Sequence, residues 1–472
     1  MRTRTKIICT LGPAVNSYEK ILELIEAGMN VARLNFSHGT QEDHLRVIQM
    51  LKKARKEKKA PLAIMLDTKG PEIRVGVIKG DSITLPQGHK LILTKEAIIG
   101  DEKHVSVTPS IVIDSLKKGM TILFDDGYLI AKVLKKSSQW ALVEIQNTGV
   151  LKTHKSMNLP EAHVDVPALS EQDIEDIIFG VSQDIDLIAA SFIRSKEHIL
   201  EIKKLLKKQK KQDTLVIAKI ESSLGVTHFE EILEVADGIM VARGDLGVEL
   251  PLKQVPSLQK MMIRKCAEKG KPVIIATQML ESMIQNPRPT RAEVSDVANA
   301  IYDSASCVML SGETASGKYP IEALKMMKSI VEEAEKDFGY RDFFDHSIRI
   351  DYHNISTAVS LAAIKIAYSL EAKALFAFTI LADTARLIAR FRPKMPLYVL
   401  TQDEKTYHQL AFSWGVIPLE PLSLASGENR FEEAKKRAKD HQKIKKGDVV
   451  VVIEGNYLGK PGITNTVRVE NI

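Results

Sequence analysis

Two apolar runs near the middle of the chain set the pattern for the rest. The runs LVIAKI (residues 215–220) and GIMVA (238–242) are separated by an amphipathic segment, THFEEILEVA. Short apolar runs of this kind are typical of parallel strands that are buried on both faces. Each run leads into charged residues, and side chains two residues apart point to the same side of a strand. The segment therefore predicts two parallel strands joined by a helix, with polar chemistry at their carboxyl ends.

The same alternation recurs along most of the chain. Strands are predicted at Thr5–Leu11, Met29–Asn35, Pro61–Thr68, Leu187–Ile193, Leu215–Glu221, Gly238–Gly244, Pro272–Gln278 and Cys307–Glu313. Helices are predicted at Ser17–Ala27, Gln41–Lys58, Glu171–Gly180, Lys196–Lys208, His228–Val235, Lys253–Lys269, Arg291–Tyr302 and Pro320 to about Lys336. Eight strand–helix units predict an α/β fold built on a closed (β/α)8 TIM barrel.

Two parts of the chain depart from this pattern. Residues 71–166 carry turn signals (GD, PQG, DDG) and two-residue alternation, as in TILFDDGYLIAKVL, so they predict a small β-barrel domain inserted after the third strand. An insertion there would lie over the active face as a lid. From about residue 341, STAVSLAAIKIAYSL, ALFAFTI, DTARLIARF, PLYVLT and GDVVVVIEG predict a C-terminal α/β domain for regulation or assembly. The expected domains are thus a barrel (1–70 and 167–340), a β lid (71–166) and a C-terminal domain (341–472).

Composition excludes several classes of protein. The chain has 472 residues, of which 44% are hydrophobic and 27% charged, as in an ordinary globular protein. It lacks a long apolar span, so no membrane segment is expected, and the apolar stretch after MRTRTK is too short for a signal peptide. Cys9, Cys266 and Cys307 have no metal or disulfide spacing, which favours a reducing cytoplasm.

The chain is basic, with a formal net charge of +6 and a pI of about 8.9. Its lysine runs, LKKARKEKK, KKLLKKQKK and KKRAKDHQKIKK, fall on helical patterns and contain no aromatic residues. Solvated helix faces explain these runs better than nucleic-acid binding does. A mildly positive field favours small anionic substrates.

Most of the predicted barrel strands end in polar residues. The carboxyl ends of barrel strands meet at one rim, where enzymes with this fold hold their active sites. One such end could be a salt-bridged barrel end, but six on one rim favour a functional site. The residues are Arg33, Asn35, Ser37, His38, Asp67, Thr68, Lys69, Glu72, Arg74, Lys219, Glu221, Arg243, Asp245, Thr277, Gln278, Ser311 and Glu313.

These residue types suit phosphate and hard cations. Glu221 and Asp245, with no His or Cys in their motifs, fit Mg²⁺, which takes carboxylate, water and phosphate oxygens. Cations of the same rim can neutralise phosphate and developing charge. The backbone of residues 243–245, before a short helical stretch, offers N–H groups to an anion. The cations are Arg33, Lys69, Arg74 and Lys219.

A second set of oxygen donors leaves two interpretations open. Asn35, Ser37, Asp67 and Thr68 could hold another hard cation, or they could make turn and cap hydrogen bonds. By contrast, the segment GETASGK (312–318) is not interpreted as a phosphate loop. Tyr319 stands where that loop requires Ser or Thr.

Several motifs together resemble one family. TKIICTLGPA, NVARLNFSHG, LDTKGPEIR, GIMVARGDLGVE, ATQMLESMIQNPRPTRAEVSDVANA, MLSGETASGKYP and the tail GKPGITNTVRVENI closely resemble pyruvate kinases, over almost the whole chain. The resemblance implies transfer of phosphate from phosphoenolpyruvate to ADP, giving pyruvate and ATP in glycolysis. It also implies Mg²⁺ or Mn²⁺, usually K⁺, and commonly a homotetramer. From the composition, a cytoplasmic location is expected, with neither nucleic acid nor membrane as a partner.

The resemblance also implies roles for individual residues. Lys219 would stabilise the transition state and the enolate oxygen, and Glu221 and Asp245 would bind the divalent metal. Thr277 would position the water that protonates enolpyruvate, with Ser311 and Glu313 behind it. Substrate contacts would come from Arg33, Lys219, Gly244, Asp245 and Thr277; K⁺ ligands from Asn35, Ser37, Asp67 and Thr68; and nucleotide contacts from Arg74, Lys155, Pro13 and His38.

Four segments depart from the family pattern, one of which is Asp303–Ser306 where the family often has DGAD before MLSGETA. Ser222–Gly225 replaces Asn-x-Glu-Gly after KIE, and His154–Glu161 replaces KKGVNLPG in the return from the lid. In the C-terminal domain, Thr379–Thr384 corresponds to a loop that cradles a sugar bisphosphate in some relatives, but it has Leu381 for a hydroxyl and Ala382 for glycine. Fructose 1,6-bisphosphate is therefore expected to activate poorly through this loop.

Two other functions compete with this one. A Mg²⁺-dependent aldolase or lyase acting on pyruvate-type substrates could use a similar Glu and Asp pair, but it needs no nucleotide site. A regulatory paralogue without activity would not require Lys219, Glu221, Asp245 and Thr277 together. Arg74, Lys155, Asp125 and Asp126 favour the kinase over the lyase.

Overall fold

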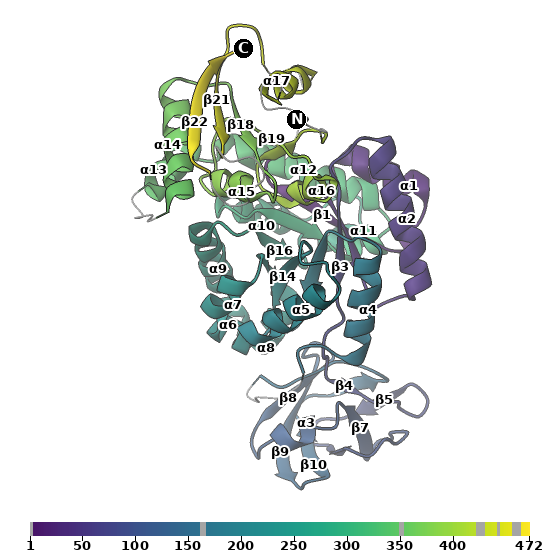
Figure 1. The fold of residues 1–472 in the computed structure, drawn as a ribbon. Coiled ribbons are helices and arrows are strands. Elements are labelled where there is room, and N and C mark those ends of the chain that lie inside the picture. The colour runs from purple at the N-terminus through teal and green to yellow at the C-terminus, as the bar shows by residue number, and fades with distance from the viewer. Residues whose placement is uncertain (1–2, 161–166, 349–353, 422–429, 441–443, 456–463) are drawn as a thin grey trace.

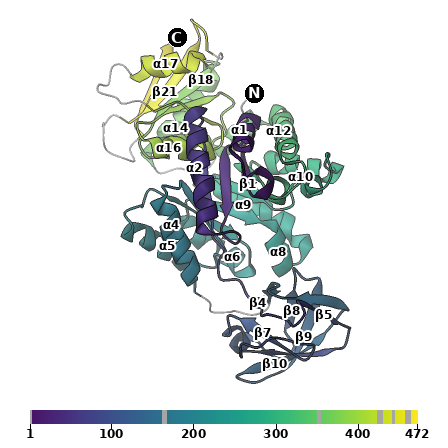
Figure 2. The ribbon, with the colours of Figure 1, turned by 90° about the vertical axis from the view of Figure 1, so that its right-hand side faces the viewer.

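The computed structural model describes residues 3–160, 167–348, 354–421, 430–440, 444–455 and 464–472. A closed barrel occupies the middle of the molecule, a β domain lies at one end and an α/β domain at the other (Figures 1 and 2). Both chain termini lie on the side of the α/β domain. No helix in the described parts of the chain is long and apolar enough to span a bilayer.

Eight parallel strands close the barrel, as the sequence predicts. In spatial order it runs β1-β17-β16-β15-β14-β13-β3-β2. Every strand is apolar over most of its length, because one face packs in the barrel interior and the other against helices. The strands are β1 Lys6–Leu11, β2 Val31–Asn35, β3 Ala63–Asp67, β13 Leu187–Ala190, β14 Leu215–Ile220, β15 Gly238–Ala242, β16 Val273–Ala276 and β17 Cys307–Leu310.

Several strands are shorter than predicted, and the difference places functional residues in the loops beyond them. β13 ends at Ala190 because Phe192 has φ 53°, which is incompatible with a strand. β17 ends at Leu310 because the short helix α11 (Gly312–Ala315) begins two residues later. Residues 243–245 were expected to precede a helix, but they form the first turn of α8 (Arg243–Glu249).

The helices around the barrel largely follow the predicted segments. Thr40, Ser170 and Thr290 each close a capping box at a helix start, which fixes where α2, α4 and α10 begin. The predicted helix from Lys253 divides into a 3₁₀ turn, η2 Leu252–Gln254, and α9. The outer helices are α1 Tyr18–Ala27, α2 Gln41–Glu57, α4 Glu171–Ser182, α5 Lys196–Lys208, α6 Ser223–Thr227, α7 Phe229–Val235, α9 Val255–Lys269, α10 Arg291–Tyr302 and α12 Pro320–Asp337, with 3₁₀ turns η1 Pro13–Val15 and η3 Glu281–Ile284.

The inserted domain is a barrel-like sheet around its own apolar core. Seven strands run in the order β12-β8-β9-β10-β6-β7-β4, and β11 pairs with β5 separately. Glu161, the last residue of the predicted return segment, lies outside the described residues. The strands are β4 Arg74–Val75, β5 Ser82–Leu85, β6 Lys90–Thr94, β7 His104–Thr108, β8 Thr121–Phe124, β9 Leu129–Lys136, β10 Trp140–Ile145, β11 Gly149–Lys152 and β12 Met157–Asn158, with one short helix, α3 Val112–Ser115.

The C-terminal domain is a five-stranded sheet of order β20-β19-β18-β21-β22 with helices on it. Sequence analysis predicted its central strands and, through the lysine run from Lys435, part of α17, but not α13, α16, β20 or β22. Residues 459–463, at the start of the tail motif, lie outside the described part of the chain. The elements are α13 Tyr340–Ser347, α14 Ile355–Ser369, β18 Ala374–Phe378, α15 Asp383–Ala389, β19 Leu397–Leu400, α16 Glu404–Gln409, η4 Leu410–Phe412, β20 Val416–Pro418, α17 Arg430–Asp440, β21 Val449–Glu454 and β22 Thr466–Asn471.

This domain closes the end of the barrel opposite the polar rim. Phe412 packs in the apolar cluster of the barrel interior. Lys6, at the start of β1, donates from Nζ to the carbonyl of Val416 at 2.8 Å, and Gln409 donates to the carbonyl of Asp186 at 3.1 Å. Barrel and C-terminal domain therefore share a buried interface.

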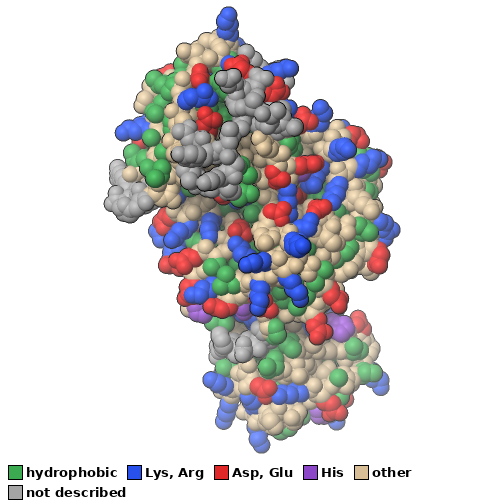
Figure 3. All heavy atoms as spheres, in the orientation of Figure 1, with side chains coloured by type: hydrophobic (Ala, Val, Ile, Leu, Met, Phe, Trp, Pro, Cys, Tyr) green, Lys and Arg blue, Asp and Glu red, His purple; other side chains and the backbone are tan. Residues whose placement is uncertain are grey.

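Charged side chains of both signs are interspersed over one face of the molecule (Figure 3). Lys and Arg lie among Asp and Glu across the face seen in Figure 3. Many form pairs along or between helices, such as Lys203 with Asp237 at 2.8 Å. The described lysine runs therefore fit solvated helix faces, as the sequence indicates.

Ala382 provides a stability prediction, because it has φ 66°. Replacing it with glycine relieves roughly 1–2 kcal/mol of left-handed strain. The same change lowers the free energy of unfolding by about 0.8 kcal/mol because a buried methyl group is removed. It lowers it by roughly another 0.5–1 kcal/mol because glycine makes the unfolded chain more flexible. Ala382→Gly is therefore expected to leave the thermal midpoint almost unchanged. Ala385→Gly, inside α15 and fully buried, should cost about 2 kcal/mol from helix propensity and lost methyl burial. Equal losses in the two variants, measured by thermal unfolding, would contradict this explanation.

Candidate active site

The polar rim of the barrel faces a cavity that the inserted domain completes. The cavity has a volume of about 480 Å³, within the range of small-molecule sites. Its walls include His38 and Asp245 from the barrel side and Asp125, Asp126 and Lys155 from the inserted domain. A ligand there would contact both domains.

Lys219 is the centre of a buried ionic network beside this cavity. Its ammonium lies 2.9 Å from Asp67 Oδ1, 3.0 Å from Glu221 Oε1 and 2.6 Å from Ser191 Oγ. Burial opposes the charge on Lys219, but attraction by Asp67 and Glu221 outweighs it and raises the pKa of Lys219. The ammonium is therefore charged and held in place at neutral pH.

Arg33 is fixed by the same network. Its Nε donates to Asp67 Oδ2 at 2.6 Å, and its Nη1 donates to Thr10 Oγ1 at 3.0 Å. Asp67 is fully buried, which alone would favour its neutral form. Arg33 and Lys219 overcome that effect and lower the pKa of Asp67. One buried carboxylate thus orients both cations of the rim.

Glu221 and Asp245 are two carboxylates that repel each other. Glu221 Oε2 accepts a hydrogen bond from the Phe192 backbone N–H at 2.6 Å. Burial raises the pKa of Glu221 to about 7, and repulsion by Asp245 adds to this rise although Lys219 opposes it. Burial, together with repulsion by Asp126 and Glu72, also raises the pKa of Asp245. A divalent cation would offset this repulsion.

The donor set fits a hydrated cation better than a fully protein-bound one. No cluster of three or more His, Cys, Asp or Glu in the described residues is arranged to hold a metal. Two carboxylate ligands are nevertheless usual for Mg²⁺, which keeps several waters and takes substrate oxygens for the remaining positions. Glu221 and Asp245 therefore fit Mg²⁺ or Mn²⁺.

Thr277 lies in a strained turn next to α8. It has φ 67° and Gln278 has φ 55°, conformations that are uncommon for a residue other than glycine and rare for a β-branched one. Thr277 Oγ1 donates to the Ala276 carbonyl at 2.6 Å and accepts from the Gly244 N–H at 2.7 Å. Arg243 donates to the Thr277 carbonyl at 2.8 Å and pairs with Asp296, so it supports this turn.

Glu313 joins two rim loops. It is fully buried, and its carboxylate accepts from the backbone N–H of Leu280 at 3.0 Å and of Ser311 at 2.7 Å. The structure therefore gives Glu313 a positioning contact with Ser311 and with the loop after β16. This arrangement places both residues behind the turn that carries Thr277.

The predicted K⁺ ligands lie together, but several of their oxygens already accept hydrogen bonds within turns and between strands. Asn35 and Asp67 are opposite each other in the register of β2 and β3. Asn35 Oδ1 accepts from the Ser37 N–H at 3.2 Å, and Thr68 Oγ1 accepts from the Ser191 N–H at 3.0 Å. The turn and cation interpretations both remain compatible with this geometry.

Three of the four predicted nucleotide residues line the cavity. Arg74 donates to Glu72 Oε2 at 2.6 Å and to the His154 carbonyl at 2.8 Å. Lys155 pairs with Asp125 at 2.7 Å. His38 lines the cavity on the barrel side. Pro13, in the 3₁₀ turn η1, is exposed and is not a lining residue.

Sequence analysis missed residues that hold this site together. Ser191 accepts from Lys219 and donates to the Thr68 carbonyl at 2.6 Å, and Phe192 anchors Glu221 through its backbone. Both follow β13, whose continuation SFIR carries a polar residue that the rim analysis left out. Thr10, at the end of β1, had no distinguishing signal.

Comparison with known proteins identifies the family. The family models "Pyruvate kinase, barrel domain" and "Pyruvate kinase, alpha/beta domain" match residues 2–324 and 357–470. The chain is 48% identical over 434 residues to a Chlamydia muridarum protein named pyruvate kinase, covering 91% of this chain and 89% of that protein. It is 43% identical over 474 residues to a Geobacillus stearothermophilus protein of the same name, covering 100% of this chain and 81% of that protein. A Clostridium acetobutylicum protein, also named pyruvate kinase, is 42% identical over 99% of both chains. Matching family models over both its barrel and its C-terminal domain, this chain belongs to the pyruvate kinase family.

Proposed function

We propose that this protein transfers the phosphoryl group of phosphoenolpyruvate to ADP, giving pyruvate and ATP. The observation that carries the proposal is the buried Lys219–Glu221–Asp67 network beside Asp245. Asp245 in turn lines the cavity together with Arg74 and Lys155. Family membership supports the reaction, and the geometry supports where it takes place.

The carboxylates Glu221 and Asp245 would hold Mg²⁺ or Mn²⁺. When bound, the ion supplies positive charge to phosphate and carboxylate oxygens of the substrate. Lys219 and Arg33 present further positive charge at the same rim, oriented in advance by Asp67. Preorganised charge of this kind stabilises a transition state more than a flexible surface group can.

The two substrates would contact different residues of the site. Phosphoenolpyruvate would lie at the barrel rim, with Gly244, Asp245 and Thr277 as its contacts. ADP would lie against Arg74, Lys155 and His38, and Pro13 would contribute only at the edge. Thr277, held by Gly244, would orient the water that protonates enolpyruvate, and Ser311 and Glu313 would position this turn.

The rival functions are less well supported. A lyase needs no cations on the inserted domain, whereas Lys155 lines the cavity. A regulatory paralogue would not need the strained Thr277 or the repelling carboxylates to persist. The similarity to proteins named pyruvate kinase favours neither alternative.

Purified protein tests the proposal directly in a coupled assay for pyruvate. Pyruvate should form from phosphoenolpyruvate only when ADP and Mg²⁺ are both present. Pyruvate formation that is independent of ADP would favour a lyase, and no pyruvate under any of these conditions would favour the inactive paralogue.

Potassium dependence is a further prediction. The family resemblance associates glutamate after LDTKGP with K⁺ dependence and lysine with independence, and Glu72 stands there. Activity should be several-fold higher in potassium than in tetramethylammonium at equal ionic strength. Glu72→Lys should reduce the difference in activity between the two salts, because the lysine ammonium would supply the positive charge that K⁺ otherwise provides.

A control addresses the contact between Glu72 and Arg74. The side chain of Glu72→Gln can still accept a hydrogen bond from Arg74, but it carries no negative charge. Comparing this variant with Glu72→Lys therefore distinguishes the effect of losing the hydrogen bond from the effect of changing the charge. Equal activity of the wild-type protein in the two salts would contradict the K⁺ site.

The assembly and domain limits also remain proposals. We expect a homotetramer in solution and domain limits at residues 1–70 with 167–340, 71–166 and 341–472. Light scattering of the purified protein measures the first, and limited proteolysis at the limits tests the second.

A further inference from the structure

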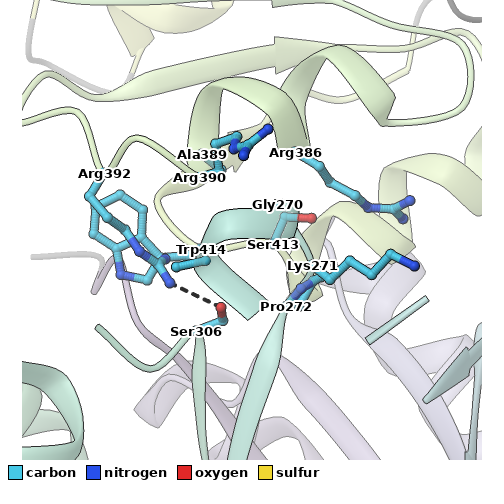
Figure 4. A pocket seen from close by; sticks show the side chains of 11 residues that line it. Gly270, Lys271, Pro272, Ser306, Arg386, Ala389, Arg390, Arg392, Ser413 and Trp414 are labelled. Carbon is cyan, nitrogen blue, oxygen red and sulfur yellow. Dashed lines mark hydrogen bonds between the residues drawn. The ribbon is translucent and has the colours of Figure 1, made fainter. Parts of the chain in front are cut away.

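A second, small cavity lies far from the active site, where the barrel meets the C-terminal domain. Its volume is about 20 Å³, which accommodates one or two groups of the size of water, since each needs about 10–15 Å³. The barrel contributes the segment Gly270–Pro272 and Ser306, and the C-terminal domain contributes Arg386, Arg392 and Ser413. In Figure 4, Arg386 and Lys271 extend in the same direction on one side, and Arg392 lies with Trp414 on the other.

Unpaired hydrogen-bond donors gather at this cavity. No described residue forms a hydrogen bond with the buried Nε and Nη2 of Arg386, with Nε of Arg392 or with Oγ of Ser413. A guanidinium has donors only and no acceptor. Buried polar groups in folded proteins nearly always have a partner, and water or an ion supplies it where the protein does not.

The neighbouring side chains do not satisfy Arg386. Asp383 and Asp237 attract it, but burial has the larger effect and lowers its pKa. Asp237 is already bonded to Lys203 Nζ and to the Val216 N–H, each at 2.8 Å. Positive charge at this end of the cavity is therefore incompletely compensated.

The other cations around the cavity are more fully engaged. Lys271 donates to the carbonyls of Leu233, Glu234 and Ala236. Arg392 donates from Nη2 to the Ser304 carbonyl at 2.7 Å and to Ser306 Oγ at 3.1 Å, and it lies over Trp414. They contribute positive potential to the cavity, while Arg386 supplies unpaired donors.

We propose that this cavity binds a small inorganic anion against the guanidinium of Arg386, at the junction of the barrel and the C-terminal domain. An anion offers acceptors to the unpaired Nε and Nη2 donors of Arg386 and requires no acceptor in return. Bound there, it would stabilise the contact between the two domains.

Anion-dependent thermal stability tests the proposal. Sodium gluconate, whose anion is too large for the cavity, is replaced stepwise by fluoride, chloride or bromide at constant ionic strength. For at least one of these probes, the unfolding midpoint of the wild-type protein should rise with the logarithm of the anion concentration, as for a ligand that binds only the folded state.

Two variants separate this cavity from anion binding elsewhere, including the active site. Arg341→Gln, which changes an exposed arginine of α13 paired with Asp345, should keep the wild-type slope. Arg386→Gln should lose more than half of it. Equal slopes in the wild-type protein and Arg386→Gln, or a flat wild-type response to all three probes, would overturn the proposal.

Crystals of the wild-type protein soaked in bromide give a second test that needs no variant. An anomalous peak in contact with Arg386 Nε or Nη2 is expected. Ordered water at that position without anomalous signal would refute the anion site, whatever the outcome of the activity assays.

Discussion

Lys219→Met should lower the turnover number at least about 10²–10³-fold while leaving the barrel folded. The ammonium pairs with both Asp67, at 2.9 Å, and Glu221, at 3.0 Å, and methionine has a similar length without its charge. Removing the charge leaves Asp67 paired with Arg33. Glu221 can take up a proton, because burial already raises its pKa to about 7. The cost to folding is therefore smaller than for an isolated buried charge.

A second buried lysine provides a matched control. Lys6 is 5% exposed and lies at the opposite end of the barrel, at the start of β1. Lys6→Met should lose stability to a similar degree and keep its turnover. If Lys219→Met retained more than a tenth of wild-type turnover with a normal circular dichroism spectrum, the role of Lys219 would be wrong.

Glu221→Gln should weaken binding of Mn²⁺ by about 10²-fold or more, since removing even a supporting contact of a metal ligand typically costs 10–100-fold. The glutamine oxygen can still accept the hydrogen bond from Phe192, so the loop should keep its conformation. With one repelling carboxylate removed, the variant should also be at least as stable as the wild type without metal. Electron paramagnetic resonance of free Mn²⁺ measures the affinity.

Glu249→Gln is the control for this substitution. Glu249 lies on the same cavity wall, at the end of α8, and burial raises its pKa as it does that of Glu221. This variant should bind Mn²⁺ like the wild-type protein. If both variants bound Mn²⁺ equally tightly, the divalent site would have to lie elsewhere.

The barrel was predictable because its signal is repeated. Eight apolar runs separated by amphipathic segments specify strand and helix periodicity independently of any contact between them. The rim was predictable for a related reason, since polar residues such as Lys219 and Asp245 directly follow buried strands. Chain topology alone brings such residues together.

Other parts of the site depend on contacts that leave no local signal. Ser191 matters because Lys219, Asp67 and Thr68 converge on it from other strands. In the sequence Glu313 resembles a catalytic carboxylate, but in the structure each of its two oxygens accepts a hydrogen bond from a backbone N–H group. Nε and Nη2 of Arg386 are buried where the C-terminal domain meets the barrel, and local periodicity does not encode that contact.

The central claim is direct phosphoryl transfer, and phosphorus NMR measures it most directly. In a mixture of the protein, Mg²⁺, K⁺, phosphoenolpyruvate and ADP, the signal of phosphoenolpyruvate should decline at the rate at which the β-phosphorus signal of ATP grows. Inorganic phosphate should stay constant, and the same mixture with Lys219→Met should change little. Growth of inorganic phosphate without ATP, or no change with the folded wild-type protein, would contradict the proposed function.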